Sequence, residues 1–190
     1  MPTSSTSVDD ATEDDDDTLA VLARERGRAL FGYAYLLSGD RGTAEDLVQD
    51  ALVRTFSRVR AGTDVAHAEA YVRSAILRGH LDALRRRQRW ATVRHLLHVP
   101  GEDTVRDPAT SVATDSAVQS ALATLAPQER VAVVLRYVED LTVPDVAAQM
   151  GLAVGTVKRY LSTGSAKLAQ RLGPLPDDAD HVVVHAREAR

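Results

Sequence analysis

The chain has 190 residues and a formal net charge of −4, and 44% of its residues are hydrophobic while only 4% are aromatic. It contains no cysteine, which excludes disulfides, thiolate metal sites and a cysteine nucleophile. A core with so few aromatic residues must be built from Leu, Val and Ala, and this composition favours helices over a β-sandwich.

The chain begins with an acidic segment, residues 1–17, that carries seven Asp and Glu residues and no Lys or Arg. Removing this charge of −7 from the total of −4 leaves +3 on the other residues. We expect the segment to be disordered because it has little to bury, and to act as a solvating tail or as an electrostatic decoy for a basic surface. It lacks the apolar core of a signal peptide, and no apolar run approaches the ~20 residues of a membrane span. We therefore expect a cytoplasmic protein without membrane insertion.

Three helices are predicted in a first module, residues 18–98. Apolar residues recur at helical spacing over 18–37, over 44–59 and over 66–89, with turn residues between these ranges. Thr43 is the expected cap of the second helix. The outer face of that helix is acidic and polar, and by spacing alone it is more simply a solvated surface than a protein contact.

The third helix ends in Arg85–Trp90, where four arginines in five residues precede the only tryptophan of the chain. Arginine at a helix C-terminus complements the helix dipole, which is the simplest explanation. Four arginines exceed what the dipole needs, however, and they favour a polyanionic partner. Tyr71 and Trp90 add aromatic surfaces on which unpaired bases could stack.

Residues 99–114 contain two prolines and a glycine among polar residues and are predicted to be a linker. A second helical module follows at 115–172, with helices expected near 117–125 and over 128–138. Gly173 and Pro174 end the last helix, and residues 173–190 are predicted to form a C-terminal tail.

The clearest pattern is a helix-turn-helix over Leu141–Leu168. Thr142 can cap its first helix, Pro144 lies in the first turn, and Gly151 ends that helix. A second helix is expected from about Val154, with an apolar stripe at 154, 157, 161 and 168 and a small, polar, cationic face opposite. Such a helix suits the major groove of DNA, although an ordinary helical hairpin would show the same spacing.

The chain shows no sequence signature of an enzyme. A phosphate-binding glycine loop, an HExxH motif and a GxSxG motif are all missing from the sequence. His95 and His98 are spaced i,i+3 without further well-placed ligands, which is weak evidence for a metal site. We expect no catalytic residues, metal or cofactor.

Three segments together resemble the extracytoplasmic-function (ECF) sigma factors of bacterial RNA polymerase, with the actinobacterial branch as the nearest comparison. These segments are LFGYAYLLSGDRGTAEDLVQDALVRTF (30–56), AYVRSAILRGHLDALRRR (70–87) and LAPQERVAVVLRYVEDLTVPDVAAQMGLAVGTVKRYL. The resemblance implies an all-α fold of two small modules joined by a flexible linker. Residues 18–98 would form the sigma region 2 bundle and residues 115–172 the region 4 helix-turn-helix.

The resemblance also implies a role for each surface. Contacts to the clamp of the polymerase's largest subunit are implied for Asp46, Leu47, Gln49 and Asp50. Contacts to the melted downstream promoter element are implied for Arg73, Arg78, His80, Asp82, Arg85 and Arg86. Reading of the upstream element is implied for Thr156, Lys158, Arg159 and Thr163, with phosphate contacts from Arg130 or Arg136.

The implied partners are core RNA polymerase, promoter DNA and an anti-sigma factor. The sequence departs from the family where Arg78 replaces a common Asn and where Ala153 replaces the usual Ser at the start of the recognition helix. A stand-alone helix-turn-helix regulator, which binds its operator without polymerase, is the alternative. It would leave residues 30–56 and 70–90 without a role.

Overall fold

The computed structural model describes residues 9–56, 65–96 and 117–173. These ranges form seven helices and no strand, which confirms the all-α prediction. The chain divides into two compact units, Met1–Asp115 and Ser116–Arg190. No helix within the described ranges is long and apolar enough to cross a membrane. The predicted linker 99–114 and residues 174–190 of the predicted tail lie outside them.

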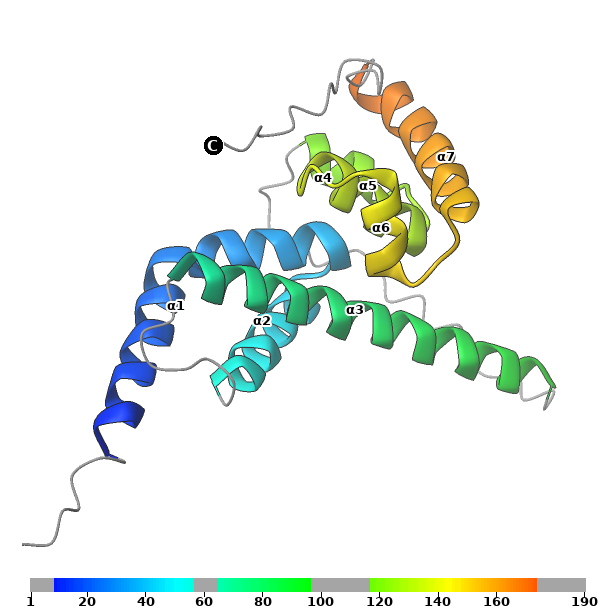
Figure 1. Cartoon of the computed structure of the whole chain (residues 1–190). Coiled ribbons are helices and arrows are strands. Elements are labelled where there is room, and N and C mark those ends of the chain that lie inside the picture. The colour runs from blue at the N-terminus through cyan, green and yellow to red at the C-terminus, as the bar shows by residue number, and fades with distance from the viewer. Residues whose placement is uncertain (1–8, 57–64, 97–116, 174–190) are drawn as a thin grey trace, which may run out of the picture. The chain divides into compact units, whose positions relative to one another are not determined.

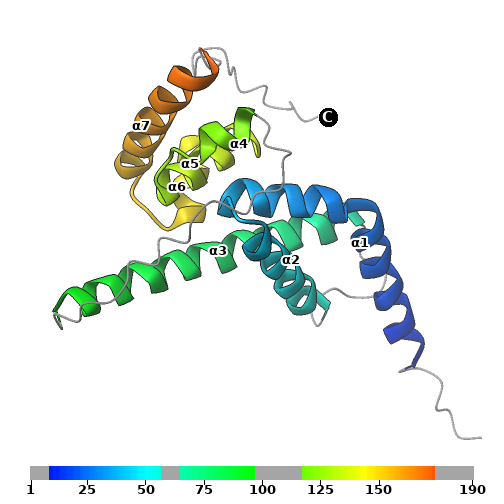
Figure 2. The same ribbon diagram turned by 180° about the vertical axis from the view of Figure 1, so that it is seen from behind.

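Unit 1 is built from three helices, each of which packs against the other two: α1 (Asp9–Ser38), α2 (Arg41–Phe56) and α3 (Val65–Leu96). Figures 1 and 2 show the second half of α1 running alongside α3 and α2 crossing α3 at an angle. The shared core is aliphatic, as the composition predicts. Its fully buried members include Leu22, Leu30, Leu37, Val72 and Ile76.

The first helix begins earlier than predicted. Because α1 starts at Asp9, the prediction of a disordered acidic segment is wrong for residues 9–17, while residues 1–8 lie outside the described range. Acidic residues near a helix N-terminus interact favourably with the helix dipole. Asp9 and Asp10 stand in the first turn of α1, the only part of the helix where the dipole favours a negative charge.

The turn between α1 and α2 is also capped differently from the prediction. Gly39 adopts a left-handed conformation with φ of 71°, and the Asp40 carboxylate accepts a hydrogen bond from the Thr43 backbone N–H at 2.8 Å. The Thr43 hydroxyl donates to the same carboxylate at 2.6 Å. Asp40, not Thr43, is therefore the cap of α2.

Unit 2 contains α4 (Ala117–Leu122), α5 (Pro127–Tyr137), α6 (Val143–Met150) and α7 (Val154–Leu172). The four helices enclose a second core. Its members include Leu122, Val131, Leu135, Val146, Met150, Val157, Leu161 and Leu168. Gly164 lets α7 approach α5 closely, because a Cβ atom at this position would lie 2.8 Å from Val133 Cγ2.

The helix-turn-helix forms as α6 and α7. The Thr142 side chain caps α6 by accepting from the Asp145 N–H at 3.3 Å, and Gly151 ends it in the left-handed conformation with φ of 64°. The predicted start of α7 at Val154 is confirmed, and its N-cap, Ala153, makes no side-chain hydrogen bond. The predicted stripe is buried at 157, 161 and 168 but not at Val154, which is 40% exposed.

Candidate functional site

The outer face of α2 brings together three of its four predicted contact residues. Asp46, Gln49 and Asp50 are all exposed, and their i, i+3, i+4 spacing places them on one helical face. Asp50 also pairs with Arg54 at 3.5 Å, but an exposed ion pair contributes little and leaves the carboxylate available.

Leu47 lies on a different side of α2 and is half-buried. Its Cδ2 is 3.3 Å from the position that a Cβ atom on Gly79 would occupy, so Leu47 packs against α3. Val53 is a residue of the acidic face that the prediction missed, since it is 67% exposed and follows Asp50 by three positions. The spacing of three from Asp50 could have placed Val53 on this face from the sequence alone. The face therefore combines carboxylates with an exposed aliphatic side chain, which suits a protein partner.

The exposed surface of α3 is cationic along its second half. Arg78, Asp82, Arg85 and Arg86 are exposed, and Arg85 forms an ion pair with Asp82 at 2.9 Å. Arg78 lies over the Tyr71 ring at 5.7 Å. Guanidinium groups beside an aromatic ring offer both phosphate contacts and a surface for base stacking.

Arg73 is held in place more firmly than its neighbours. It is half-buried, donates to Glu69 at 3.1 Å and lies over the Tyr33 ring of α1 at 5.0 Å. Glu69 in turn pairs with Arg26 of α1 at 3.4 Å. Arg73 therefore joins α3 to α1 and has only part of its surface left for another partner.

His80 does not share the exposed surface of α3. It is only 6% exposed, so this conformation of the protein does not offer its ring to DNA. The sequence already contained the signal: position 80 is four residues from both Ile76 and Leu84, which lie on the buried stripe of α3.

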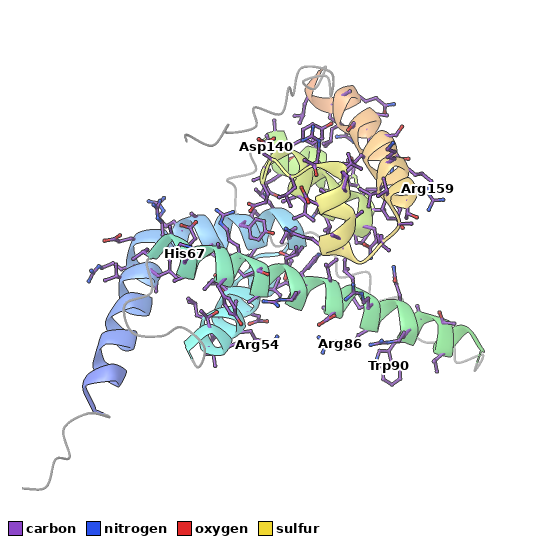
Figure 3. The ribbon with its side chains drawn as sticks, in the orientation of Figure 1. Arg54, His67, Arg86, Trp90, Asp140 and Arg159 are labelled. Carbon is purple, nitrogen blue, oxygen red and sulfur yellow. The ribbon has the colours of Figure 1, made fainter. Side chains whose placement is uncertain are left out.

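The recognition helix α7 has the predicted two-sided character. Lys158, Arg159 and Thr163 are exposed and Thr156 is half-buried, while Val157 faces the core. Figure 3 shows Arg159 extending outward from α7. The face is small enough and cationic enough to enter a major groove.

Arg130 and Arg136 do not belong to this surface, and the suggestion that they contact phosphates is wrong for the structure as it stands. Both are 8% exposed. Arg130 Nε donates to the Leu122 carbonyl at 3.0 Å, and Arg136 Nη1 donates to the Leu141 carbonyl at 3.2 Å. Arg136 also lies 3.7 Å from the Asp140 carboxylate. These arginines hold the chain around α5 in place.

Glu129 and Lys167 form the one ion pair between α5 and α7 that we find in the described part of unit 2, with an Nζ to Oε2 distance of 2.7 Å. The same Glu129 oxygen accepts from the Ala126 backbone N–H at 2.9 Å. Burial alone would raise the pKa of Glu129, but the hydrogen bonds from Lys167 and Ala126 and the lysine charge together lower it below its ordinary value. Among the described residues, no three potential metal-ligating side chains gather in one place.

Comparison with known proteins places both units in one family. Sigma-70 region 2 matches residues 22–90, and sigma-70 region 4 matches residues 115–168. The RNA polymerase sigma-E factor of Streptomyces avermitilis is 35% identical over 87% of this chain and 90% of its own length. The ECF RNA polymerase sigma factor SigM of Mycobacterium tuberculosis is 32% identical over 81% of this chain and 76% of its own length.

A solved structure is similar to this chain as well. It is the sigma factor RpoE of Bartonella quintana, crystallised with the anti-sigma factor NepR, with a TM-score of 0.51, 27% identity and coverage of 83% of this chain and 94% of that one. Two family regions in the right order, together with relatives more than 30% identical over three quarters or more of their length, leave one assignment. The chain belongs to the RNA polymerase sigma factors of the extracytoplasmic-function type.

Proposed function

We propose that this protein binds core RNA polymerase and directs it to a specific set of promoters. The observation that carries the proposal is that one chain contains both a region 2 unit with an exposed acidic face and a region 4 unit with a helix-turn-helix. A sigma factor needs both, whereas a stand-alone regulator needs only the second. The protein is an initiation factor rather than an enzyme, and its place of action is the cytoplasm.

The polymerase contact is assigned to α2. Asp46, Gln49 and Asp50 face solvent and would contact the clamp of the largest subunit, while Leu47 supports them from behind by packing on α3. A helix anchored on one side by its core residues presents its outer side chains in a fixed register, which favours specific recognition.

The contact with the melted downstream element is assigned to α3. Arg78, Asp82, Arg85 and Arg86 are exposed along its surface and would face the unpaired strand. Arg73 supports this surface from its position between Glu69 and Tyr33. His80, which is buried, would act on DNA only through the packing of α3.

The upstream element is assigned to Thr156, Lys158, Arg159 and Thr163 of α7. The face carries only two cations, and its helix lacks a side-chain cap at Ala153, so its own affinity for duplex DNA is expected to be low. Attachment to polymerase through unit 1 raises the effective concentration of unit 2 at the promoter. Promoter binding therefore depends on the holoenzyme.

We also propose that an anti-sigma factor controls the protein. The structurally similar sigma factor from Bartonella quintana was solved in complex with such a partner. A partner that covers the α2 face would block the binding of polymerase.

Two assays on the full-length chain test the proposed function. Immobilised protein is incubated with purified core RNA polymerase, and retained polymerase subunits are measured. The same protein with core enzyme is then tested for discrete run-off transcripts on fragmented genomic DNA of the source bacterium. A sigma factor gives both signals. A stand-alone regulator retains no polymerase, and a protein that retains polymerase without transcripts is a decoy; either result would overturn the proposal.

A further inference from the structure

Tyr137 joins the end of α5 to the recognition helix α7. It is the last residue of α5, and its hydroxyl lies 3.2 Å from the Ser165 hydroxyl of α7, within hydrogen-bond distance. The two residues are 28 positions apart in the sequence, and both are half-buried. The bond is therefore a long-range contact between a largely buried helix and the helix that carries the DNA-reading face.

The Tyr137 ring is itself held in place. The Arg136 guanidinium lies 5.9 Å from the centre of the ring, and Arg136 Nη1 donates to the Leu141 carbonyl at 3.2 Å. A tyrosine side chain also has only two rotatable bonds, so little conformational freedom is lost when its hydroxyl is directed at a partner. The hydroxyl therefore offers Ser165 a fixed contact point.

Two further contacts between α5 and α7 show what this bond adds. Gly164 makes the close approach to Val133, and Lys167 pairs with Glu129 at 2.7 Å. At 3.6 residues per turn, Ser165 is turned by about 100° from Gly164 in one direction around the helix axis, and Lys167 by about 60° in the other. The two polar contacts therefore flank the close approach, and together they oppose rotation of α7 about its own axis.

The rotation of α7 decides which base edges its reading face meets. The tips of helical side chains lie about 5–6 Å from the helix axis, so a rotation of about 10° shifts them by roughly 1 Å. Specific recognition requires side chains to be placed to within about 0.5 Å. Thr163 precedes Ser165 by two residues, and Arg159 extends outward from the same helix (Figure 3). A contact that fixes the rotation at Ser165 therefore also fixes the direction in which Thr163 and Arg159 point.

We propose that Tyr137 is a positioning residue for promoter recognition. Its bond to Ser165 fixes the rotation of α7, so that the reading face discriminates between base pairs of the upstream element, while neither hydroxyl contacts DNA. This inference rests on the proposed function, because it needs α7 to read promoter DNA. If Ser165 instead held a DNA phosphate, removal of the Tyr137 hydroxyl would free the serine for that contact and would strengthen binding.

Transcription by core polymerase with the full-length chain tests the proposal. The genomic fragment that gives the strongest run-off transcript with the wild type is mutated one base pair at a time across both promoter elements. For each mutant fragment, the ratio of parent transcript to mutant transcript measures discrimination. Tyr137→Phe keeps the ring and loses the hydroxyl, and we expect it to lower the largest ratios in the upstream element by about three-fold or more. The ratios in the downstream element, the retention of core polymerase and the melting temperature should stay close to those of the wild type.

A double-mutant cycle shows whether the two hydroxyls act as a pair. Ser165→Ala should reduce upstream discrimination as much as Tyr137→Phe does, and the double variant should reduce it no further, because each single variant already breaks the same bond. Ser120→Ala removes an exposed hydroxyl from α4 and is the matched control, with wild-type ratios expected. Unchanged upstream ratios in Tyr137→Phe would overturn the proposal. Losses that add in the double variant, or equal losses at both promoter elements, would also overturn it, because they indicate separate roles or a general loss of activity.

The outcomes distinguish this proposal from the proposed function. If the wild type gives discrete transcripts and Tyr137→Phe keeps their upstream discrimination, only the positioning role fails. If the wild type retains no polymerase or gives no transcripts, the proposed function fails, and with it the role of Tyr137 in promoter recognition.

Discussion

Gly164 shows how one residue sets the distance between two helices. A Cβ atom there would lie 2.8 Å from Val133 Cγ2, whereas one on Gly155 of the same helix would meet nothing within 4 Å. Val133 is β-branched and cannot easily move aside. The close approach at Gly164 was not visible in the sequence, because a glycine within a helical pattern looks the same whether it faces a neighbouring helix or open space.

Substitution of these two glycines should therefore have opposite effects. Alanine gains about 1 kcal/mol of helix propensity over glycine, but the overpacking at position 164 costs about 1–3 kcal/mol. We expect Gly164→Ala to destabilise unit 2 by about 1 kcal/mol or more and Gly155→Ala to stabilise it by up to about 1 kcal/mol. Hydrogen exchange of α5 and α7 in the full chain measures both changes. Stabilisation by Gly164→Ala would contradict the close approach.

Glu129 makes the stability of unit 2 depend on pH. Its folded-state pKa is lower than its ordinary value, so the ionised form stabilises the fold above that ordinary value, and this contribution is lost as the pH falls through the folded-state pKa. Glu129→Gln should destabilise unit 2 by about 1–2 kcal/mol at pH 7, and the difference from wild type should shrink below about pH 4. Urea unfolding at several pH values, followed by hydrogen exchange in α5, tests this. A difference that stays constant with pH would show that the charge is irrelevant.

At the scale of elements, α2 separates a packing side from a binding side. Ala44 and Ala51 are buried and Leu47 packs on α3, while Asp46 and Asp50 face solvent, where the exposed pair of Asp50 with Arg54 contributes little to stability. Because the acidic side chains support the fold so little, their charge can be reversed with only a small loss of stability.

Reversal of this charge should remove polymerase binding. We expect Asp46→Lys with Asp50→Lys to weaken core binding by at least about ten-fold and to leave the melting temperature nearly unchanged. Glu25→Lys, at an exposed position of α1, makes half of this change in net charge away from α2 and should bind core polymerase normally. The amount of core polymerase retained at increasing protein concentration gives the comparison. Normal retention by the double variant would show that α2 is not the polymerase contact.

Local chemistry explains which elements could be predicted. The helix-turn-helix was predictable because Thr142, Pro144 and Gly151 determine its boundaries through short-range effects: a cap, a fixed φ and a left-handed turn. The burial of Arg130 and Arg136 was not predictable. A buried arginine that donates to a carbonyl cannot be told from a surface arginine until the packing of the helices is known.

Two further differences come from the limits of helical spacing. The burial of His80 followed from its helical spacing, but the resemblance to the ECF sigma factors implied a contact with DNA. Val154 satisfies the spacing of the apolar stripe, yet it is the first residue of α7 and remains exposed. Spacing predicts which residues share a face, but not how far along a helix that face is covered.

At the scale of the whole molecule, charge is separated along unit 1. Arg26 of α1 pairs with Glu69 of α3, and Arg89 lies twenty residues further along α3, which is roughly 30 Å at 1.5 Å per residue. Residues 9–17 belong to α1 and precede Arg26 by at least nine positions. Figures 1 and 2 show the first turns of α1 and the end of α3 at opposite ends of the unit. The acidic segment is therefore far from the arginines of residues 85–89.

For the arginines of α3, this distance favours a solvating segment over a decoy. The Debye length is about 8 Å at 0.15 M salt and about 30 Å at 0.01 M. Deletion of residues 2–17 removes seven negative charges, and we expect it to leave the affinity of the free protein for fork DNA, a duplex with a single-stranded tail, unchanged at 0.15 M while raising it several-fold at 0.01 M. Anisotropy titrations of the wild type and the deletion at both salt concentrations make the comparison. Stronger binding by the deletion at 0.15 M would mean that the acidic segment reaches the arginines directly, and the decoy would then be the correct description.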